Sequence, residues 1–389
     1  MPLPKSQTVE NEPMPEVAVN GRVLKWARDL RGLSIDSAAS LLGIPADELR
    51  EYETGNKRPL VGLLRLMSAK YEINFTSLLM PEPLPVQTQP TDHRERFCRQ
   101  PLTIDSLVAI EEVSEALDAF ADIAAESPRM IQKLNIGNAM LDENPEAVAA
   151  RERKRFGITI EEQQSWRGED HARRRWRQRI EEFGVFTYMI KLQPADELSG
   201  FSMFRDGLAA ICVNDREPTD GAKSFTLLHE YCHLLLRQTG ISDENNKNRV
   251  ERFCNRFAAS FLIPKHALRA EIGDIEIPCE FSDSEVKRLS RRFRVSNRAM
   301  AYRLEETGFA PSGFYGRRTA PWDLPVEPIV ITSEKQPTPI TLLLKRIGRL
   351  HAATVLRASQ KHVINSFDAS QLIGLKPTFL PKLQRKVFG

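Results

Sequence analysis

The stretch FTLLHEYCHLLL, residues 225 to 236, places two histidines four positions apart, with a glutamate directly after the first, in an otherwise apolar run. Residues four apart lie one turn above each other on a helix, so His229 and His233 project their imidazoles toward one point. That is the geometry of a two-histidine metal clamp. Glu230 points off the ligand axis, so we predict that it acts as a base and not as a ligand.

The burial of these charges favours a metal over a hydrogen-bonded histidine pair. A carboxylate between two imidazoles in a leucine-rich helix costs on the order of several kcal/mol without a cation. We expect the third ligand from NRVERFCNRFAASFLIP, residues 248 to 264, where Glu251 lies beside an apolar stripe at helical spacing. Asn255, one turn on, is expected to hold a ligand in place. Two imidazoles and one carboxylate favour Zn²⁺ and leave a fourth position for water.

Two β-rich segments precede this helix. VFTYMIKLQ, residues 185 to 193, and GLAAICVN, residues 207 to 214, are bounded by Gly, Pro, Asn and Asp. They predict a small sheet that leads into the H-E-x-x-H helix. For GLAAICVN two interpretations stay open: an edge strand that pairs with an extended substrate, or a buried central strand.

Residues 18 to 80 read as a string of short helices, the pattern of a five-helix helix-turn-helix domain, and residues 1 to 17 as a disordered N-terminus. The stretch resembles the repressor-type helix-turn-helix family in its Leu-Gly-Ile turn at residues 42 to 44 and its Y-E-x-G-x-x-x-P ending at residues 52 to 59. The helix after the turn starts with Pro-Ala-Asp-Glu, which a phosphate backbone would repel. Specific DNA binding and a module that holds a protein partner or dimerises therefore both stay open.

The remaining segments differ in composition. Residues 81 to 101 form a Pro-rich linker, and a helical region follows from Thr103 to Arg179. Residues 282 to 309 have a second helix-turn-helix-like pattern, for which a structural helical cap is favoured over DNA contact. Residues 310 to 389 are basic and mostly helical, with one helix predicted from Ile340 to Ala358 and a short helical pair after it. From Lys335 onward there are ten Lys or Arg and one acid, so this tail is the candidate for an anionic partner such as DNA.

Composition limits the class of protein. The chain has 389 residues, 41% hydrophobic and 28% charged, and its longest apolar runs fall short of the roughly 18 residues that span a bilayer. The N-terminus lacks the apolar core of a signal peptide. We therefore expect a cytoplasmic protein with no membrane partner. The five cysteines include no C-x-x-C pair, so reduced thiols are expected, and a homodimer stays open.

Three segments together resemble the ImmA/IrrE family of metallopeptidases: KSFTLLHEYCHLLL, ERFCNRFAASFLIP and FRVSNRAMAYRLEETG. The resemblance spans Val185 to Phe309. It implies an α+β, mostly α fold with a zincin-like metallopeptidase domain at residues 102 to 309. It also implies Zn²⁺ held by His229, His233 and Glu251, with Glu230 as the general base. Family members also carry a fused repressor-like domain and resemble proteases that act on phage, mobile-element or stress repressors.

Peptide hydrolysis further needs a donor for the developing oxyanion. Tyr231, His266, Tyr302 and Arg303 are the candidates, with core or surface packing as the competing interpretation of each. The sequence thus predicts a zinc-dependent endopeptidase that cleaves a regulatory protein, such as a repressor or an antitoxin, and so controls transcription. The alternative is a DNA-binding transcriptional regulator or toxin-antitoxin component in which zinc is structural or sensory.

Overall fold

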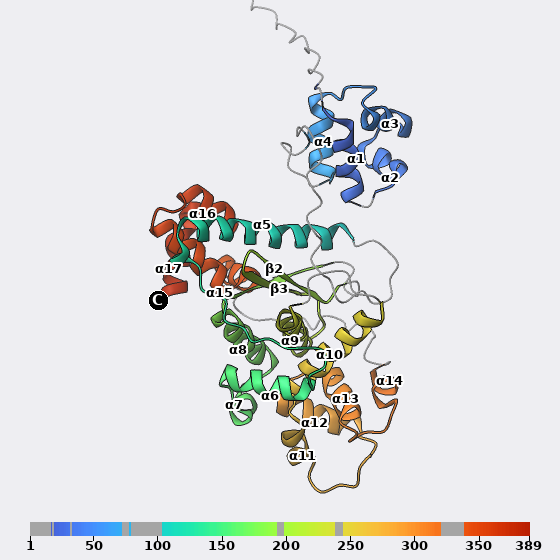
Figure 1. Ribbon diagram of the computed structural model, residues 1–389, viewed down its shortest axis with the longest axis vertical. Helices are drawn as coiled ribbons and strands as arrows, with labels where there is room; N and C mark the ends of the chain where they lie inside the picture. The colour runs from blue at the N-terminus through green and yellow to red at the C-terminus, as the bar shows by residue number, and fades with distance from the viewer. Residues whose placement is uncertain are drawn as a thin grey trace, which may run out of the picture. The chain divides into compact units, whose positions relative to one another are not determined.

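A computed structural model describes residues 17, 19–31, 33–71, 78, 103–192, 198–237, 244–319 and 338–389. The chain divides into two compact units, residues 1–89 with 99–108 and residues 90–98 with 109–389 (Figure 1). The predicted linker at 81–101 and the predicted disordered N-terminus, apart from Val17, lie outside the described residues. Among the helices that the structure describes, none is long and apolar enough to cross a membrane.

In its described residues the first unit contains four short helices before α5 (Ile104–Glu126) begins. They are α1 (Gly21–Leu30), α2 (Ile35–Leu42), α3 (Ala46–Thr54) and α4 (Val61–Tyr71). Gly43 ends α2 in the left-handed conformation that glycine adopts without strain, which makes the tight turn into α3. A buried ion pair between Arg28 and Glu53, with a closest distance of 2.6 Å, ties α1 to α3. The expected fifth helix falls on residues outside the described ranges.

The second unit is built on a three-stranded sheet. Its strands are β1 (Val185–Ile190), β2 (Gly200–Arg205) and β3 (Leu208–Asn214), in the order β1-β3-β2. β1 runs parallel to β3 and β2 antiparallel to it. The sequence pattern predicted β1 and β3 but not β2. Because β3 has a neighbour on each side, it is the central strand, and the edge-strand interpretation of GLAAICVN is wrong.

One face of the sheet packs against the helices that carry the H-E-x-x-H motif and its partners. Ala209, Ile211 and Val213 of β3 share a core with α9 (Asp220–Leu236) and α10 (Glu244–Leu262), as the alternation of a strand requires. Other helices of this region are α6 (Pro145–Phe156), α7 (Ile160–Ser165), α8 (Glu169–Glu182), α11 (Lys265–Ile272), α12 (Asp283–Phe293), α13 (Asn297–Glu306) and α14 (Phe314–Thr319).

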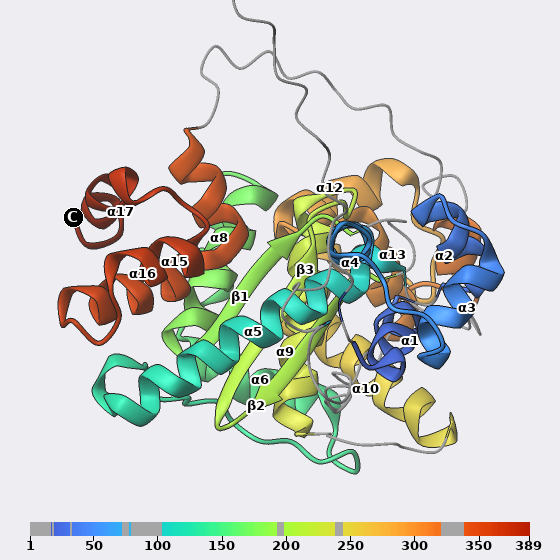
Figure 2. The same ribbon diagram turned by 90° about the horizontal axis from the view of Figure 1, so that it is seen from above.

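The opposite face of the sheet is covered by helices from two distant parts of the chain. They are α5 (Ile104–Glu126), which crosses the strands in Figure 2, and α15 (Pro339–Gln360), α16 (Ser366–Ile373) and α17 (Leu380–Phe388). Phe120 of α5 stacks on Phe186 of β1 with ring centroids 4.4 Å apart. Ala210 and Cys212 of β3 belong to this second core. The fold is therefore α+β and mostly α, as predicted, with the sheet between two helical layers.

α15 is interrupted at Gly348, where the sequence predicted an unbroken helix. Gly348 has φ 81° and ψ 166°, a conformation open in practice only to glycine. The carboxylate of Glu181 on α8 accepts hydrogen bonds from the backbone N–H of Arg349 (3.1 Å) and Leu350 (3.2 Å), which begin the second half. Arg177 donates to the Lys345 carbonyl at the end of the first half. Two charged side chains of α8 thus satisfy the backbone groups that the break releases.

Candidate metal centre

The helix α9 is buried along almost its whole length, and polar contacts fix its N-terminus. Thr219 caps it by accepting from the backbone N–H of Ala222, and Glu169 accepts from that of Gly221 at 2.8 Å. Arg173 of α8 pairs with Asp220 at 2.7 Å. These contacts fix the rotation and the depth of α9 against the sheet.

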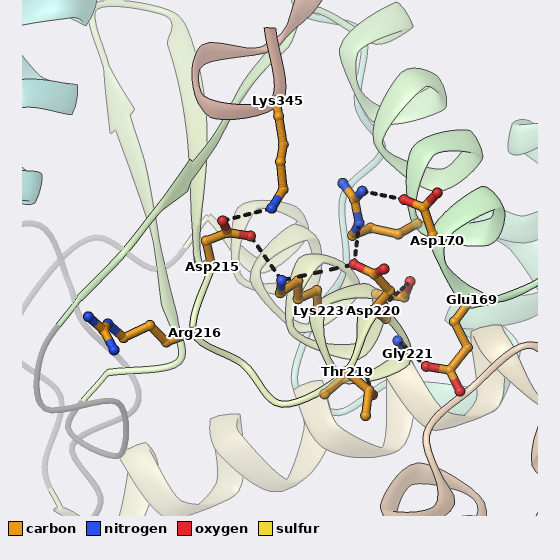
Figure 3. A network of polar contacts seen from close by, with 12 residues as sticks. Glu169, Asp170, Asp215, Arg216, Thr219, Asp220, Gly221, Lys223 and Lys345 are labelled. Carbon is orange, nitrogen blue, oxygen red and sulfur yellow. Dashed lines mark hydrogen bonds and ion pairs between the residues drawn. The ribbon is translucent and has the colours of Figure 1, made fainter. Parts of the chain in front are cut away.

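Asp215, at the end of β3, adds a second anchor. Its carboxylate contacts Lys223 of α9 at 2.9 Å and Lys345 of α15 at 2.8 Å (Figure 3). Burial alone would raise the pKa of Asp215, but the hydrogen bonds from the two lysines outweigh it and leave the pKa below its ordinary value. The carboxylate therefore stays charged and links the metal-motif helix to the C-terminal helices.

The structure brings His229, His233 and Glu251 together. Glu251 lies on α10 with one carboxylate oxygen 3.3 Å from Nε2 of His229 and the other 3.3 Å from Nε2 of His233. The two Nε2 atoms are 3.0 Å apart. Both histidines are buried, while the Glu251 side chain keeps 24% of its exposure, so the cluster opens toward solvent on the α10 side.

The far nitrogen of each imidazole also has a partner on α10. Oδ1 of Asn255 lies 2.9 Å from Nδ1 of His229; an amide oxygen only accepts, so Nδ1 carries the hydrogen and Nε2 offers its lone pair to the cluster. Sγ of Cys254 lies 3.6 Å from Nδ1 of His233 and occupies the corresponding position there. Successive residues of one helix turn therefore orient both candidate ligands.

The electrostatics of the cluster favour a cation. Burial would raise the pKa of Glu251, yet its hydrogen bonds with the two imidazoles hold that pKa well below the ordinary range. Burial would likewise lower the pKa of His233, but Cys254 and the nearby carboxylates raise it well above its usual value. The lowered pKa of Glu251 and the raised pKa of His233 both mean that positive charge is stabilised between these three side chains.

The donor set fits zinc. The three ligand atoms all lie within 4.8 Å of one another. Two ligands that share a tetrahedral Zn²⁺ at about 2.0–2.1 Å are roughly 3.4 Å apart, close to the separations seen here. Two imidazole nitrogens with one carboxylate are also the donors that catalytic zinc sites use, with one position left for water.

Glu230 is held beside the cluster by the strand that sequence reasoning missed. It is only 2% exposed, and its Oε2 accepts a hydrogen bond from Oγ of Ser202 at 3.1 Å. Ser202 lies on β2. Gly200, two residues earlier, leaves no room for a Cβ, which would stand 3.4 Å from Cγ of Glu230 and 2.8 Å from Thr226. The small residues of β2 thus allow α9 to approach the strand closely.

Two of the candidate oxyanion donors are engaged in the core. The hydroxyl of Tyr231 donates to Glu152 at 2.8 Å. Arg303 is fully buried and donates to the Ile263 carbonyl at 2.9 Å and to Glu146 at 3.0 Å. The packing interpretation accounts for both side chains.

The other two candidates lie in different surroundings. Tyr302 packs edge-to-face against Phe225 and Tyr315, with ring centroids 6.5 and 5.8 Å away. His266 is exposed and lines a cavity that Arg303 also lines and to which no member of the histidine-glutamate cluster contributes. The contacts of these two residues give no evidence of a role at the cluster.

An H-E-x-x-H helix beside a small sheet, with a carboxylate from the next helix, is the arrangement of metal-dependent peptidases. In agreement, residues 180–305 match the IrrE N-terminal-like domain family, Peptidase_M78. The matched residues include β1 to β3 and the helices α9 to α12, so the similarity covers every member of the cluster. No curated protein matches the chain.

Proposed function

We propose that this protein is a zinc-dependent endopeptidase that cleaves a regulatory protein of the repressor or antitoxin type. The observation that carries the proposal is the position of Glu230, buried and oriented by Ser202 next to three converging ligands. A carboxylate at this position is not needed to coordinate a zinc ion that three other side chains hold. Its placement suits a proton acceptor.

The residues divide the chemistry among them. A zinc ion held by His229, His233 and Glu251 would act as a Lewis acid and make a water nucleophilic near neutral pH. Glu230 takes the proton of the attacking water and then delivers it to the amine that leaves. Ser202 keeps the Glu230 carboxylate pointed at that position, and Asn255 and Cys254 keep the imidazole lone pairs directed inward.

The first unit is proposed to recruit the protein substrate. The start of α3, where a DNA-reading helix would contact base edges, carries Asp47 and Glu48. Glu48 is already paired with Lys57 at 2.5 Å. Acidic side chains there disfavour contact with phosphates. A protein partner of the repressor or antitoxin type therefore suits this surface better than a DNA duplex.

Replacing Glu230 by glutamine tests the proposal. The amide is nearly isosteric but accepts no proton, so the variant should keep its fold and its zinc while losing roughly 10² to 10⁴-fold of cleavage. A pull-down from the native host should then retain an intact partner that the wild-type protein recovers only as fragments. Glu276→Gln, which changes an exposed carboxylate, is the matched control and should cleave like wild type.

The same experiment separates the proposal from its alternative. If wild type and Glu230→Gln regulate identically and leave every bound partner whole, the protein is a regulator in which zinc is structural or sensory. A zinc content that falls in Glu230→Gln would instead make Glu230 a ligand and not a base.

A further inference from the structure

A concave site that includes no member of the histidine-glutamate cluster lies among α6, α10, α11 and α13. It is a cavity of about 900 Å³, and none of its lining residues belongs to the histidine-glutamate cluster. Its charge is one-sided: the Lys and Arg side chains that line it are Arg153, Lys154, Lys265, Arg269 and Arg303, against the single carboxylate of Glu146. We name it the basic cavity.

Arg153 forms no ion pair within the described residues, although Glu161 and Glu162 act on its charge from farther away. It is 8% exposed, and its guanidinium donates to the carbonyls of Phe261 (2.7 Å) and Thr159 (3.2 Å) and lies 5.5 Å from the ring centre of Trp176. Burial lowers its pKa to about 10. A buried guanidinium that is bound only to neutral acceptors leaves positive charge available to an anion.

Three residues that line the basic cavity each carry a buried donor atom without a hydrogen-bond partner in the described part of the chain. They are Oγ of Ser260, Nη1 of Arg269 and Nη2 of Arg303. Ser260 is 5% exposed and Arg303 is fully buried. Buried polar atoms are nearly always paired, so three unpaired donors on residues that line one cavity leave hydrogen-bonding capacity beside it, which a ligand rich in acceptor oxygens could use if these side chains turn toward it.

The start of α11 adds backbone N–H donors to these side chains. Pro264, Lys265 and His266 at its N-terminus line the basic cavity, and no side chain caps this eight-residue helix. Its first backbone N–H groups and its dipole favour negative charge at this point. Cationic side chains, unpaired donors and the helix terminus all select the same sign of ligand.

We propose that the basic cavity binds a small organic phosphate of about the size of a mononucleotide. Planar guanidinium groups match phosphate oxygens, and the volume lies in the range of small-molecule sites and far exceeds one inorganic ion. The lining also offers an apolar wall from Ala150, Ile158, Pro264 and Phe309 for the organic part. Arg153 and Arg303 bind the carbonyls of Phe261 and Ile263, so a ligand held by these arginines would be linked through them to the end of the helix that carries Glu251.

Calorimetric titration of the full-length protein with AMP, adenosine and inorganic phosphate at fixed ionic strength tests the site. AMP should bind saturably, adenosine should not bind, and inorganic phosphate should bind at least about tenfold more weakly than AMP. Ser260→Ala and Arg269→Gln should each weaken AMP by about tenfold or more, with zinc content unchanged. Lys287→Gln, an exposed lysine outside the basic cavity, should bind like wild type.

Three results would overturn the proposal. The first is the absence of saturable AMP binding. The second is AMP binding that survives both cavity substitutions, which would place the binding site elsewhere on the protein. The third is inorganic phosphate that binds as tightly as AMP, which would reduce the cavity to an ion site. Melting curves of both variants establish that each is folded, and the zinc assay separates a failure here from a failure of the peptidase proposal.

Discussion

At the scale of single residues, the three candidate ligands act as one unit. Purified protein is expected to carry about one zinc per chain, and His229→Ala, His233→Ala and Glu251→Ala should each remove most of it, because two remaining ligands hold zinc weakly. Elemental analysis after dialysis gives the measurement. Full zinc in all three variants would disprove the ligand assignment.

Ser202 offers a test of how Glu230 is oriented. Ser202→Ala removes the hydrogen bond that Ser202 donates to the Glu230 carboxylate, so we expect kcat to fall roughly tenfold while KM and zinc content stay near wild type. Ser284→Ala, on the exposed side of α12, is the control and should leave kcat unchanged. An unaffected kcat in Ser202→Ala would mean that the carboxylate holds its position without this contact.

The sequence predicted the ligand cluster because its members obey local periodicity. His229 and His233 are one turn apart, and Glu251 and Asn255 share a turn of the next helix. Ser202 and Cys254 were missed for different reasons. Ser202 lies on a strand that pairs through its backbone, and Cys254 looked like an ordinary buried thiol because its contact with His233 depends on how two helices pack.

At the scale of elements, the interruption of α15 makes a sharp prediction. Gly348→Ala puts a Cβ 2.8 Å from the Thr187 carbonyl and against Glu181, in a backbone conformation that only glycine adopts easily. We expect a loss of about 2–4 kcal/mol in the free energy of unfolding, from strain and displacement together. Thermal melts should show a lower Tm.

The matched control is Gly316→Ala in α14. Its Cβ would meet nothing within 4 Å, and the helix favours alanine, so Tm should stay or rise slightly. A Gly348→Ala variant as stable as Gly316→Ala would show that α15 can straighten without cost.

The break in α15 and the strand β2 could not be predicted from the local sequence. A single glycine in a helical pattern is tolerated, so nothing local distinguished Gly348 from a glycine inside a continuous helix. The break exists because Glu181 and Arg177, about 170 positions earlier, bind the released backbone groups. β2 is short and starts at a glycine, and its identity comes from pairing with β3 and not from its own six residues.

At the scale of the whole molecule, one buried histidine makes stability depend on pH. His351 of α15 is neutral: Nδ1 accepts from the hydroxyl of Tyr188 at 3.0 Å, and Nε2 donates to the Leu372 carbonyl at 2.9 Å. Burial lowers its pKa to about 4 from the ordinary 6.5. The unfolded chain therefore takes up a proton below about pH 6.5, whereas the folded chain does so only near pH 4.

The contribution of neutral His351 to the free energy of unfolding is complete above pH 6.5 and is lost as the pH falls toward 4. At pH 5 the loss is about 2 kcal/mol, which denaturant titrations at pH 7 and 5 can resolve. His351→Gln should be less sensitive to acid over this range than wild type, and His362→Asn, an exposed histidine, should not differ from wild type. Equal acid sensitivity in His351→Gln would assign the effect to other groups.

The covering of the sheet has a consequence for protein synthesis. The strands and helices that hold the candidate ligands lie between residues 185 and 262, yet the second face of the sheet is closed by α5 before them and by α15 to α17 after them. A ribosome delivers the chain from its N-terminus, so Phe186, Tyr188 and Cys212 stay without their final neighbours until residues 339–388 have emerged. A chain released early, after the candidate ligands but before α15, would carry the whole H-E-x-x-H motif on an incompletely covered sheet. We therefore expect a chain that stops before α15 to be less stable than one that contains it, because one face of its sheet would lack these neighbours.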